Sequence, residues 1–403
     1  MFHLIDAPAS RRRFRQLHEE LNGLGFEGQN LERLLFDVIM PRLEMVDVDP
    51  FWARKAPVMF SPRHPVPDFG EIPAPLRLLL RVFHENQTVR RGELEALLST
   101  SALGTLLESG MVSEDGPLLT PNVSLSEWHG LLLAADRYER NTQHDAVLRP
   151  HISTAAVEWY LPAPQPLSKG VDIGTGTGVL AMLLNRRYGA TIHAVDLNAR
   201  AVEFCKLNLA INDVDAVEVS VADHNAVARE PHLAGAVDLL VWNMPATFWE
   251  HEALGWGFKS KDVGERTVAE VYQALPSLLS QRGVAIVRHE SKVPVSWVDT
   301  LLRSIPGSDS LQVLFAHEGE AAHQERAEVD NLLKDNWEEG MPVHDPSYVL
   351  GVSLIRRRVD PQAAPLGFLP IASWQEWTDF QGERWQERWA SLPGWRDYRI
   401  MPE

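Results

Sequence analysis

The residues best suited to chemistry follow three strand-like runs of the chain. The first run, VDIGTGTG, places Gly174, Gly176 and Gly178 on the turn between a strand and a helix. Glycine lets the backbone approach a ligand closely, and a helix N-terminus offers free N–H groups. Asp196 ends the next run, where its carboxylate can accept hydrogen bonds from both hydroxyls of a ribose. Asp223 ends the third run, where it can read an adenine amino group. This order of residues predicts a nucleoside-containing cofactor.

A fourth apolar run, residues 237–242, stops abruptly at Asn243, Met244, Pro245 and Ala246. Such an ending is either an ordinary exit from a strand or the display of an asparagine at a strand tip. An asparagine oxygen and a backbone carbonyl can accept both hydrogens of a weakly nucleophilic amide or aromatic amine. Those bonds orient the nitrogen lone pair and support the positive charge that develops on nitrogen. The glycine-rich turn and the two strand-end acids upstream favour the display of Asn243 at a strand tip.

The elements that must position these residues alternate between strand and helix from about residue 168 onward. This alternation predicts a doubly wound α/β domain with a parallel sheet. Later β-like runs at 310–318 and 347–358 are expected to close the sheet. The predicted strands are 170–176, 191–198, 217–223, 236–243 and 283–291, and the predicted helices are 178–189, 199–212 and 265–281.

The preceding part, residues 1–150, is predicted to be mainly helical. Three short helical patterns at 75–85, 90–99 and 101–111 precede a turn and an extended run, which is the layout of a winged helix. Such a module either binds DNA or packs against the rest of the protein and presents substrate. The third helix carries no Lys or Arg, whereas a helix that reads a DNA groove needs cations and polar groups. We favour the packing module.

The predicted domains are therefore 1–150, 151–358 and a tail at 359–403. The second domain contains an insertion at 318–347 with nine acidic and two basic residues, which fits either a lid or a solvated surface helix. The tail is expected to dock an aromatic stripe on the body of the protein, with a ligand box or a dimer contact as the alternative. Its tryptophans are Trp374, Trp377, Trp385, Trp389 and Trp395.

Composition limits the class of protein. The 403 residues suffice for two or three domains, and no apolar run is long enough to span a membrane. The N-terminal residues have their apolar stretch before the basic cluster, the reverse of a secretory signal, so a cytoplasmic location is expected. A net charge of −17 disfavours nucleic-acid binding through a general basic field, although it leaves room for a local basic groove. The single Cys205 excludes an intramolecular disulfide and a multi-cysteine zinc site, and no metal is expected.

Taken together, the motifs resemble those of the class I S-adenosylmethionine-dependent methyltransferases. DIGTGTG is similar to the family's first motif, AVDLN to its ribose-binding acid, and ADHN to its adenine-contacting acid. The resemblance covers about residues 150–358 and implies a Rossmann-like sheet and S-adenosyl-L-methionine as the cofactor. The cofactor residues that it implies are Asp172, Gly174, Thr175, Gly176, Gly178, Asp196, Leu197, Asp223, His224 and Asn243.

Within that superfamily, DLLVWNMPA stands in the place of an Asn-Pro-Pro-Tyr motif. The chain thereby resembles the methyltransferase small domain group, including the release-factor glutamine and ribosomal-RNA guanine-N2 methyltransferases. By this resemblance Asn243 supplies a side-chain oxygen and Met244 a backbone carbonyl to the acceptor, followed by Pro245. Two departures are Met244 in place of the first proline and Ala246 in place of the stacking aromatic residue. Phe248 or Trp249 is the candidate replacement for that aromatic ring.

Other polar residues are weaker candidates for the site. His151, with Ser153, precedes the first motif and is either a base or substrate ligand or a surface histidine. His289 and Glu290 end a predicted strand at the edge where ligands bind. Tyr138 and Arg140 lie at the expected domain junction. His224 is expected to form a wall of the cofactor pocket rather than to act as a base.

The sequence thus predicts an enzyme that N-methylates a small molecule, amino acid or peptide. A ribosomal- or transfer-RNA base methyltransferase is the main alternative. Two others remain open. One is an enzyme that uses S-adenosylmethionine without methylation, by cyclising its aminobutyryl group, and the other is a non-catalytic protein that binds the cofactor. The oligomeric state is left open.

Overall fold

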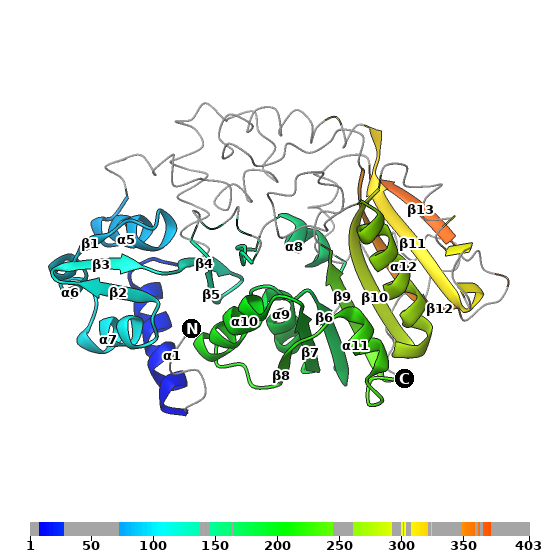
Figure 1. Ribbon diagram of the computed structural model, residues 1–403, viewed down its shortest axis with the longest axis horizontal. Coiled ribbons are helices and arrows are strands. Elements are labelled where there is room, and N and C mark those ends of the chain that lie inside the picture. Colours follow the sequence, from blue (N-terminus) through cyan, green and yellow to red (C-terminus); the bar gives the residue numbers. More distant parts are fainter. Residues whose placement is uncertain are drawn as a thin grey trace.

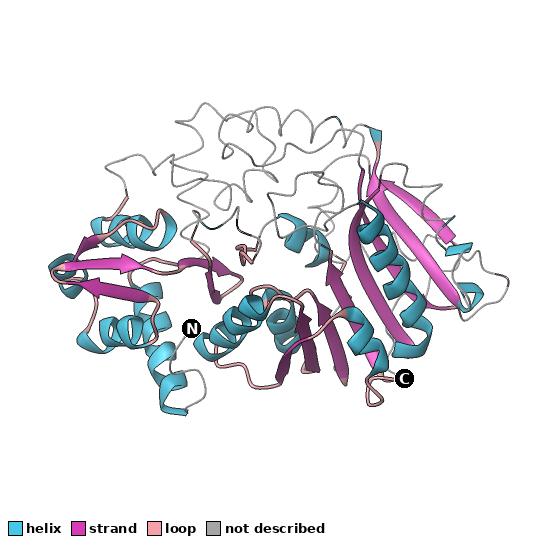
Figure 2. Ribbon diagram, in the orientation of Figure 1, coloured by secondary structure: helices cyan, strands magenta, loops and turns pink. Residues whose placement is uncertain are grey.

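The computed structural model describes residues 8–27, 72–137, 140, 143, 145–150, 152–158, 160–162, 164–244, 261–291, 300, 302–303, 308–320, 324, 349–358, 362 and 366–371. An N-terminal module of short helices and small strands lies beside a large sheet with helices on both faces (Figures 1 and 2). His151, Pro245, Tyr138 and the tail tryptophans fall outside the described residues, as do Ala246, Phe248, Trp249 and most of the predicted insertion.

The N-terminal module follows the predicted order of helices and hairpin. Its helices are α1 (Pro8–Gly23), α5 (Ala74–Leu79), which continues into the π-helix η3 (Leu80–His84), α6 (Arg91–Glu95) and α7 (Thr100–Glu108). Its strands β1 (Val89–Arg90), β2 (Val112–Asp115) and β3 (Leu118–Pro121) form a sheet in the order β1-β3-β2. The assignment of this module to the winged-helix class stays a prediction.

A second hairpin joins the module to the rest of the protein. Strands β4 (Ser124–Trp128) and β5 (Leu131–Ala135) pair with each other, and β5 lies along helix α10 (Ala199–Ile211). The amide of Asn208 on α10 accepts from the N–H of Ala134 at 2.7 Å and donates to its carbonyl at 2.9 Å. Asn212 does the same to Leu132, at 2.9 and 2.8 Å. These two side chains satisfy the free edge of β5 as a neighbouring strand would.

The large sheet has the order β13-β11-β12-β10-β9-β6-β7-β8. Strands β6 to β10 are mutually parallel, and β12 runs antiparallel to its neighbours. The chain moves outward from β6 to β8 and returns to β9 on the other side of β6, so the switch point lies between β6 and β9. The bounds are β6 (Lys169–Ile173), β7 (Thr191–Asp196), β8 (Val217–Val221), β9 (Val237–Asn243), β10 (Leu279–Ser291), β11 (Leu311–Glu318), β12 (Val349–Arg357) and β13 (Leu366–Ile371).

This architecture confirms the predicted doubly wound α/β fold. The late runs do close the sheet as β11 and β12. Strand β13 adds a further edge from the segment expected to be tail, beside β11, and it was not anticipated.

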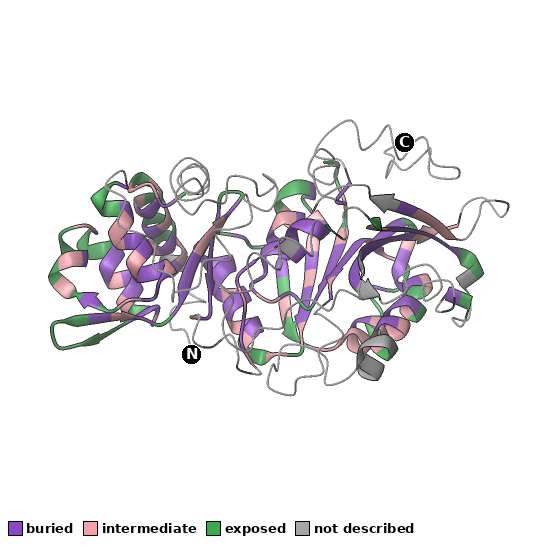
Figure 3. Ribbon diagram, turned by 90° about the horizontal axis from the view of Figure 1, so that it is seen from above, coloured by how far each residue is buried: buried purple, intermediate pink, exposed green. Residues whose placement is uncertain are grey.

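Helices cover both faces of the sheet. Helices α8 (Ile152–Glu158), α9 (Val179–Tyr188) and α10 pack on one face, and α11 (His224–Arg229) and α12 (Lys261–Leu278) pack on the other. Alternate residues of a strand face opposite sides, so Val241 and Ile286 meet the first group of helices, whereas Trp242 and Val287 meet the second. Figure 3 shows the resulting band of buried strands.

Helix α10 is buried on two sides. Cys205 and Leu209 belong to the core of the sheet, whereas Phe204, Leu207 and Ile211 belong to the core of the N-terminal module. A helix that is apolar over most of its surface is a buried helix. The apolar contacts of α10 on both sides therefore fix the N-terminal module against the domain that carries the predicted cofactor motifs.

Candidate active site

A glycine-rich loop connects β6 to α9, and hydrogen bonds to the side chain of Asp172 hold its conformation. The Asp172 Oδ2 atom accepts from the hydroxyl of Thr175 at 2.7 Å and from the N–H of Ala181 at 3.1 Å. The carboxyl group is buried, and this burial raises the pKa of Asp172 to about 7. The side chains of Asp172 and Thr175 thus hold the loop, and only the backbone of Thr175 is left to meet a ligand.

Two glycines of this loop have different roles. Gly176 has φ 55°, and a Cβ added there would meet nothing within 4 Å, so it faces open space. Gly178 has φ 82°, and a Cβ there would lie 2.5 Å from the Sγ atom of Cys205. Gly178 is therefore required for packing of the loop against α10, whereas Gly176 keeps the loop accessible. Burial raises the pKa of the Cys205 thiol to about 12, which agrees with a buried structural residue.

Asp196 lies at the end of β7, directly beside the open side of the loop. Its Oδ2 accepts from the N–H of Gly176 at 2.9 Å, and its Oδ1 accepts from the N–H of Asn198 at 2.9 Å. Burial raises the pKa of this carboxyl above its usual value. The arrangement presents an oriented carboxylate next to a loop with exposed backbone, as a ribose-binding site requires.

The neighbouring strand ends expose apolar side chains. Leu197 is 74% exposed and Val221 is 55% exposed, although most large apolar residues of the described chain are buried. Asp196 pairs with Val221 across β7 and β8, so the two apolar side chains lie close to the Asp196 carboxylate. A planar base stacked there would cover them, so these residues fit the adenosine part of a cofactor.

Asp223 and His224 begin α11. Asp223 is the N-cap residue, and its Oδ1 accepts from the N–H of Ala226 at 2.7 Å, so one oxygen has a structural role. His224 lies 2.8 Å from Oε2 of Glu270 on α12. The hydrogen bond from His224 lowers the pKa of Glu270. This pairing gives His224 a partner on α12, and its expected place in the wall of a cofactor pocket stays a prediction.

Asn243 is the last residue of β9 and faces helix α8. Its Nδ2 atom donates to Oγ of Ser153 at 3.0 Å. Its Oδ1 atom is buried, and no donor among the described residues contacts it. A buried carbonyl oxygen without a donor costs free energy, so this oxygen is a candidate to accept a hydrogen bond from a ligand.

The family comparison gives the class of this site. Residues 155–259 match the family described as the methyltransferase small domain. The chain carries a methyltransferase small domain. This match spans the glycine-rich loop, Asp196, Asp223 and Asn243, and it confirms the predicted S-adenosylmethionine-dependent methyltransferase family and the cofactor class of that family.

Individual relatives of the methyltransferase domain are distant or partial. Ribosomal protein L11 methyltransferase of Bacillus cytotoxicus is 37% identical over 76 residues, which are 19% of this chain and 23% of that protein. The chain thus spans about a quarter of the length of the curated relatives it matches. Trm5b of Pyrococcus abyssi has a TM-score of 0.38 at 14% identity, covering 61% of this chain and 62% of that chain. A ribosomal protein L11 methylase of Lactobacillus delbrueckii has a TM-score of 0.32 at 16% identity, covering 56% and 82%.

Arg288 is a residue of the methyltransferase domain that the sequence analysis missed. It pairs with Asn243 across β9 and β10, so the two side chains share the α8 face of the sheet. The buried guanidinium donates from Nη1 to the carbonyl of Met244 at 3.0 Å, and the Arg288 carbonyl accepts from the N–H of Met244 at 3.2 Å. The carbonyl that the resemblance assigns to the acceptor therefore already has one donor.

His289, predicted to line the substrate site, lies on the other face of the sheet. Its ring stacks on Phe315 with centroids 5.0 Å apart, and its Nε2 lies 2.9 Å from Oγ of Ser353. The prediction for His289 was wrong because strand alternation places it opposite Asn243 and Arg288. The side chain of Glu290 lies outside the described residues.

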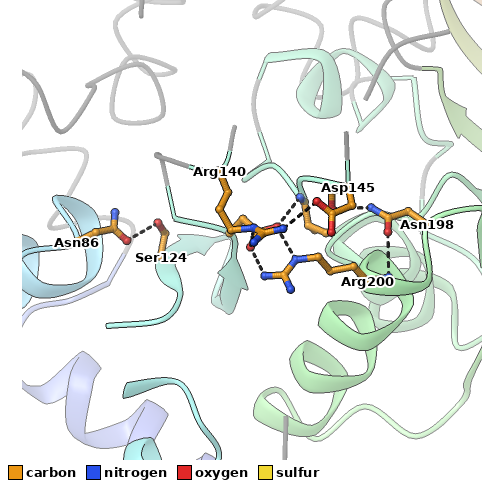
Figure 4. Close-up of polar contacts among 8 residues, drawn as sticks. Asn86, Ser124, Arg140, Asp145, Asn198 and Arg200 are labelled. Carbon is orange, nitrogen blue, oxygen red and sulfur yellow. Dashed lines mark hydrogen bonds and ion pairs between the residues drawn. The ribbon is translucent and has the colours of Figure 1, made fainter. Parts of the chain in front are cut away.

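A buried polar network ties the methyltransferase domain to the segment after β5 (Figure 4). The carboxylate of Asp136 has no exposed surface and accepts from Nε of Arg200 at 3.0 Å and from its Nη2. Arg140 lies 3.3 Å from Asp136 and 2.8 Å from Asp145. The Asp145 carbonyl accepts from Nδ2 of Asn198, two residues after Asp196, at 2.9 Å. Arg140, expected at the domain junction, thus belongs to a network that reaches the cofactor loop.

Within the described ranges, no three His, Cys, Asp or Glu residues are placed to hold a metal ion. The helices that the structure describes include none that is long and apolar enough to cross a membrane.

Proposed function

We propose that this protein transfers the methyl group of S-adenosylmethionine to a nitrogen of a small molecule, an amino acid or a peptide. The observation that carries the proposal is the buried Oδ1 of Asn243, which lacks a donor among the described residues and lies at the switch-point edge of the sheet. An acceptor nitrogen that bears a hydrogen would complete this atom.

The residues around the loop would hold the cofactor in a defined orientation. The backbone at Gly174 to Gly178 would meet its amino-acid part, Asp196 its ribose hydroxyls, and Leu197, Val221 and Asp223 its adenine. The bound sulfonium supplies an electrophilic methyl group. The nearby strand β9 would place Asn243 in front of that methyl group, because the carboxyl ends of parallel strands meet at one edge.

Asn243 would act by orientation and electrostatics. Its Oδ1 accepts the N–H of the acceptor, which directs the nitrogen lone pair toward the methyl carbon for an in-line displacement. As the N–C bond forms and the S–C bond breaks, positive charge moves to nitrogen, and the carbonyl dipole stabilises it. The nitrogen would then release its proton to solvent water, and the demethylated cofactor, S-adenosylhomocysteine, would leave with both electrons of the S–C bond.

Met244 would contribute less than the resemblance implies. A carbonyl oxygen has two lone pairs, and the guanidinium of Arg288 already uses one at the Met244 oxygen. The bound cation also draws electron density from that oxygen. Asn243 is therefore the stronger of the two acceptors in this site.

The charges of the N-terminal module support a small or peptide acceptor over RNA. Three arginines of α1 pair with acids: Arg11 with Asp215, Arg13 with Glu108 of α7 at 2.6 Å, and Arg15 with Asp213. Glu20 of α1 also accepts from Oγ of Ser99, the N-cap residue of α7, at 2.7 Å. The helix that would enter a nucleic-acid groove thus lies against α1, and the cations nearby are neutralised. The curated relatives are named for a protein acceptor, ribosomal protein L11.

The test is an incubation of the protein with isotopically labelled S-adenosylmethionine and an extract of the organism that makes it, followed by separation of small molecules, protein and RNA. Label on nitrogen in the small-molecule or protein fraction supports the proposal. Label confined to RNA would identify an RNA methyltransferase instead. Cofactor binding without labelled product identifies a binding protein, and a product formed from the cofactor alone identifies cyclisation.

A further inference from the structure

We propose that Ser153 is a positioning residue that decides which end of the Asn243 amide faces the acceptor. This inference rests on the proposed function, because it assigns a role to the partner of the acceptor-binding residue. Ser153 is buried on α8, and its Oγ lies 3.0 Å from Nδ2 of Asn243.

The amide of asparagine has no strong preference of its own between two orientations. The terminal torsion of Asn is broad and roughly two-fold, so the oxygen and nitrogen can exchange places at little cost. If they exchanged here, Nδ2 would point to the place where the acceptor N–H must lie, and two donors would face each other. In the structure the hydroxyl of Ser153 accepts from Nδ2, which leaves Oδ1 directed to the acceptor. A hydroxyl could also donate to Oδ1 in the exchanged orientation, so Ser153 and the acceptor N–H fix the amide together.

Ser153 can perform this role only if α8 is held in place, and the structure shows two anchors. Ala155, Ala156 and Val157 are buried in the core of the sheet. At the end of the helix, Glu158 accepts from Nε1 of Trp128 at 3.0 Å and lies 3.0 Å from Nε2 of His129. Both partners belong to the β4–β5 hairpin, so the hairpin that docks on α10 also holds the helix that orients Asn243.

The experiment compares four variants in the full chain: Ser153→Ala, Ser153→Thr, Asn243→Ala and, as a matched control, Thr154→Ala. Thr154 is buried on the same helix, so its variant reports the general effect of removing a hydroxyl from α8. Three quantities are measured. They are the dissociation constant of S-adenosylhomocysteine by calorimetry, the turnover number and KM for methyl transfer from tritiated S-adenosylmethionine to the labelled fraction, and the solvent exchange rate of the Asn243 side-chain N–H groups by NMR.

Ser153→Ala should lower the turnover number about tenfold, the effect of one lost hydrogen bond, with an unchanged dissociation constant and KM for the cofactor. Ser153→Thr retains the hydroxyl and should restore turnover to within about threefold. In Ser153→Ala the exchange of the Asn243 Nδ2 protons should rise about tenfold, because hydrogen-bonded amides exchange more slowly. Thr154→Ala should change none of these quantities.

Full turnover in Ser153→Ala, with Asn243→Ala inactive, overturns the role of Ser153 and leaves the proposed function intact. An equal loss in Thr154→Ala also overturns it, since the effect is then one of general packing. If wild-type protein transfers no methyl group, or Asn243→Ala retains full turnover, the proposed function fails. The exchange measurement then still decides whether Ser153 fixes the amide, and unchanged exchange in Ser153→Ala contradicts it.

Discussion

Asn208 on helix α10 hydrogen-bonds through its side-chain amide to both the N–H and the carbonyl of Ala134 on strand β5. The same Nδ2 donates to the carbonyl of Thr177 in the glycine-rich loop at 2.9 Å. One buried amide therefore joins the N-terminal module to the loop that would hold the cofactor. Position of the module and shape of the loop are linked through this residue.

Replacement of Asn208 by alanine should destabilise the protein by about 3 kcal/mol, because it leaves three buried backbone groups without a partner. Urea unfolding followed by circular dichroism measures this change. Asn122→Ala is the control. Asn122 is on the surface of the N-terminal module, and its side chain donates to the carbonyl of Gly110. Its replacement should lower the free energy of unfolding by about 1 kcal/mol. Equal effects of the two variants would contradict the linking role of Asn208.

Two glycine substitutions in the loop should separate binding from folding. Gly178→Ala should lower the free energy of unfolding by about 2–4 kcal/mol, because its Cβ would collide with Cys205 and its φ is positive. Gly176→Ala should cost about 1 kcal/mol from backbone strain alone. It should nevertheless weaken S-adenosylmethionine binding at least about tenfold, since its methyl group faces the open side of the loop. Calorimetry that finds normal binding by Gly176→Ala would refute the position assigned to the cofactor.

Asp172 should make stability depend on pH. Burial raises its pKa in the folded protein to about 7 from 3.8, so the folded state holds one proton more than the unfolded state between these values. Its contribution is therefore fully present at low pH and is lost as the pH rises from about 4 to about 7. In Asp172→Asn this dependence is absent. The free energy of unfolding of the wild type, relative to the variant, should fall by up to about 4 kcal/mol between pH 4 and pH 8.

Another buried titrating group, His84, has a pKa shift in the opposite direction. Burial and the nearby Arg149 lower the pKa of His84 to about 3, so its contribution is lost as the pH falls from about 6.5. His84 is the same in wild type and Asp172→Asn, so its effect cancels in their difference. A difference that does not change with pH would show that Asp172 is not protonated in the folded state.

The ion pair of Arg200 and Asp136 should matter more than those on the surface. Arg200→Ala removes the bidentate partner of a fully buried carboxylate, which keeps only Arg140 and the N–H of Val147, and should cost about 2–3 kcal/mol. Arg11→Ala breaks an exposed pair with Asp215 and should cost at most about 1 kcal/mol. Denaturant unfolding of both variants checks the contrast. Similar small losses would mean that the polar network in Figure 4 does not hold the module in place.

Much of the cofactor side could be predicted from sequence because its residues follow local rules. A glycine-rich turn after a strand and an acid at the next strand end are separated by fixed, short elements, and the structure brings Gly176 and Asp196 within one hydrogen bond. The helix and strand positions around them followed from periodicity alone.

The surroundings of Asn243 could not be predicted to the same depth, because they depend on how strands β9 and β10 pair. Only the register of β9 and β10 shows that Arg288, and not His289, shares a face with Asn243. Asn208 and Asn212 carry a sequence signal: two amides four residues apart in the 199–212 helical pattern indicate a shared polar partner. That partner, the edge of β5, is distant in sequence.

In the proposed mechanism Asn243 binds the acceptor and not the cofactor. Calorimetric binding of S-adenosylmethionine, measured together with the methyl-transfer rate in wild type and Asn243→Ala, tests this role. For Asn243→Ala we expect a dissociation constant within about threefold of wild type and a transfer rate lowered about a hundredfold or more. Full transfer by Asn243→Ala, or loss of transfer explained by loss of cofactor binding, would contradict it.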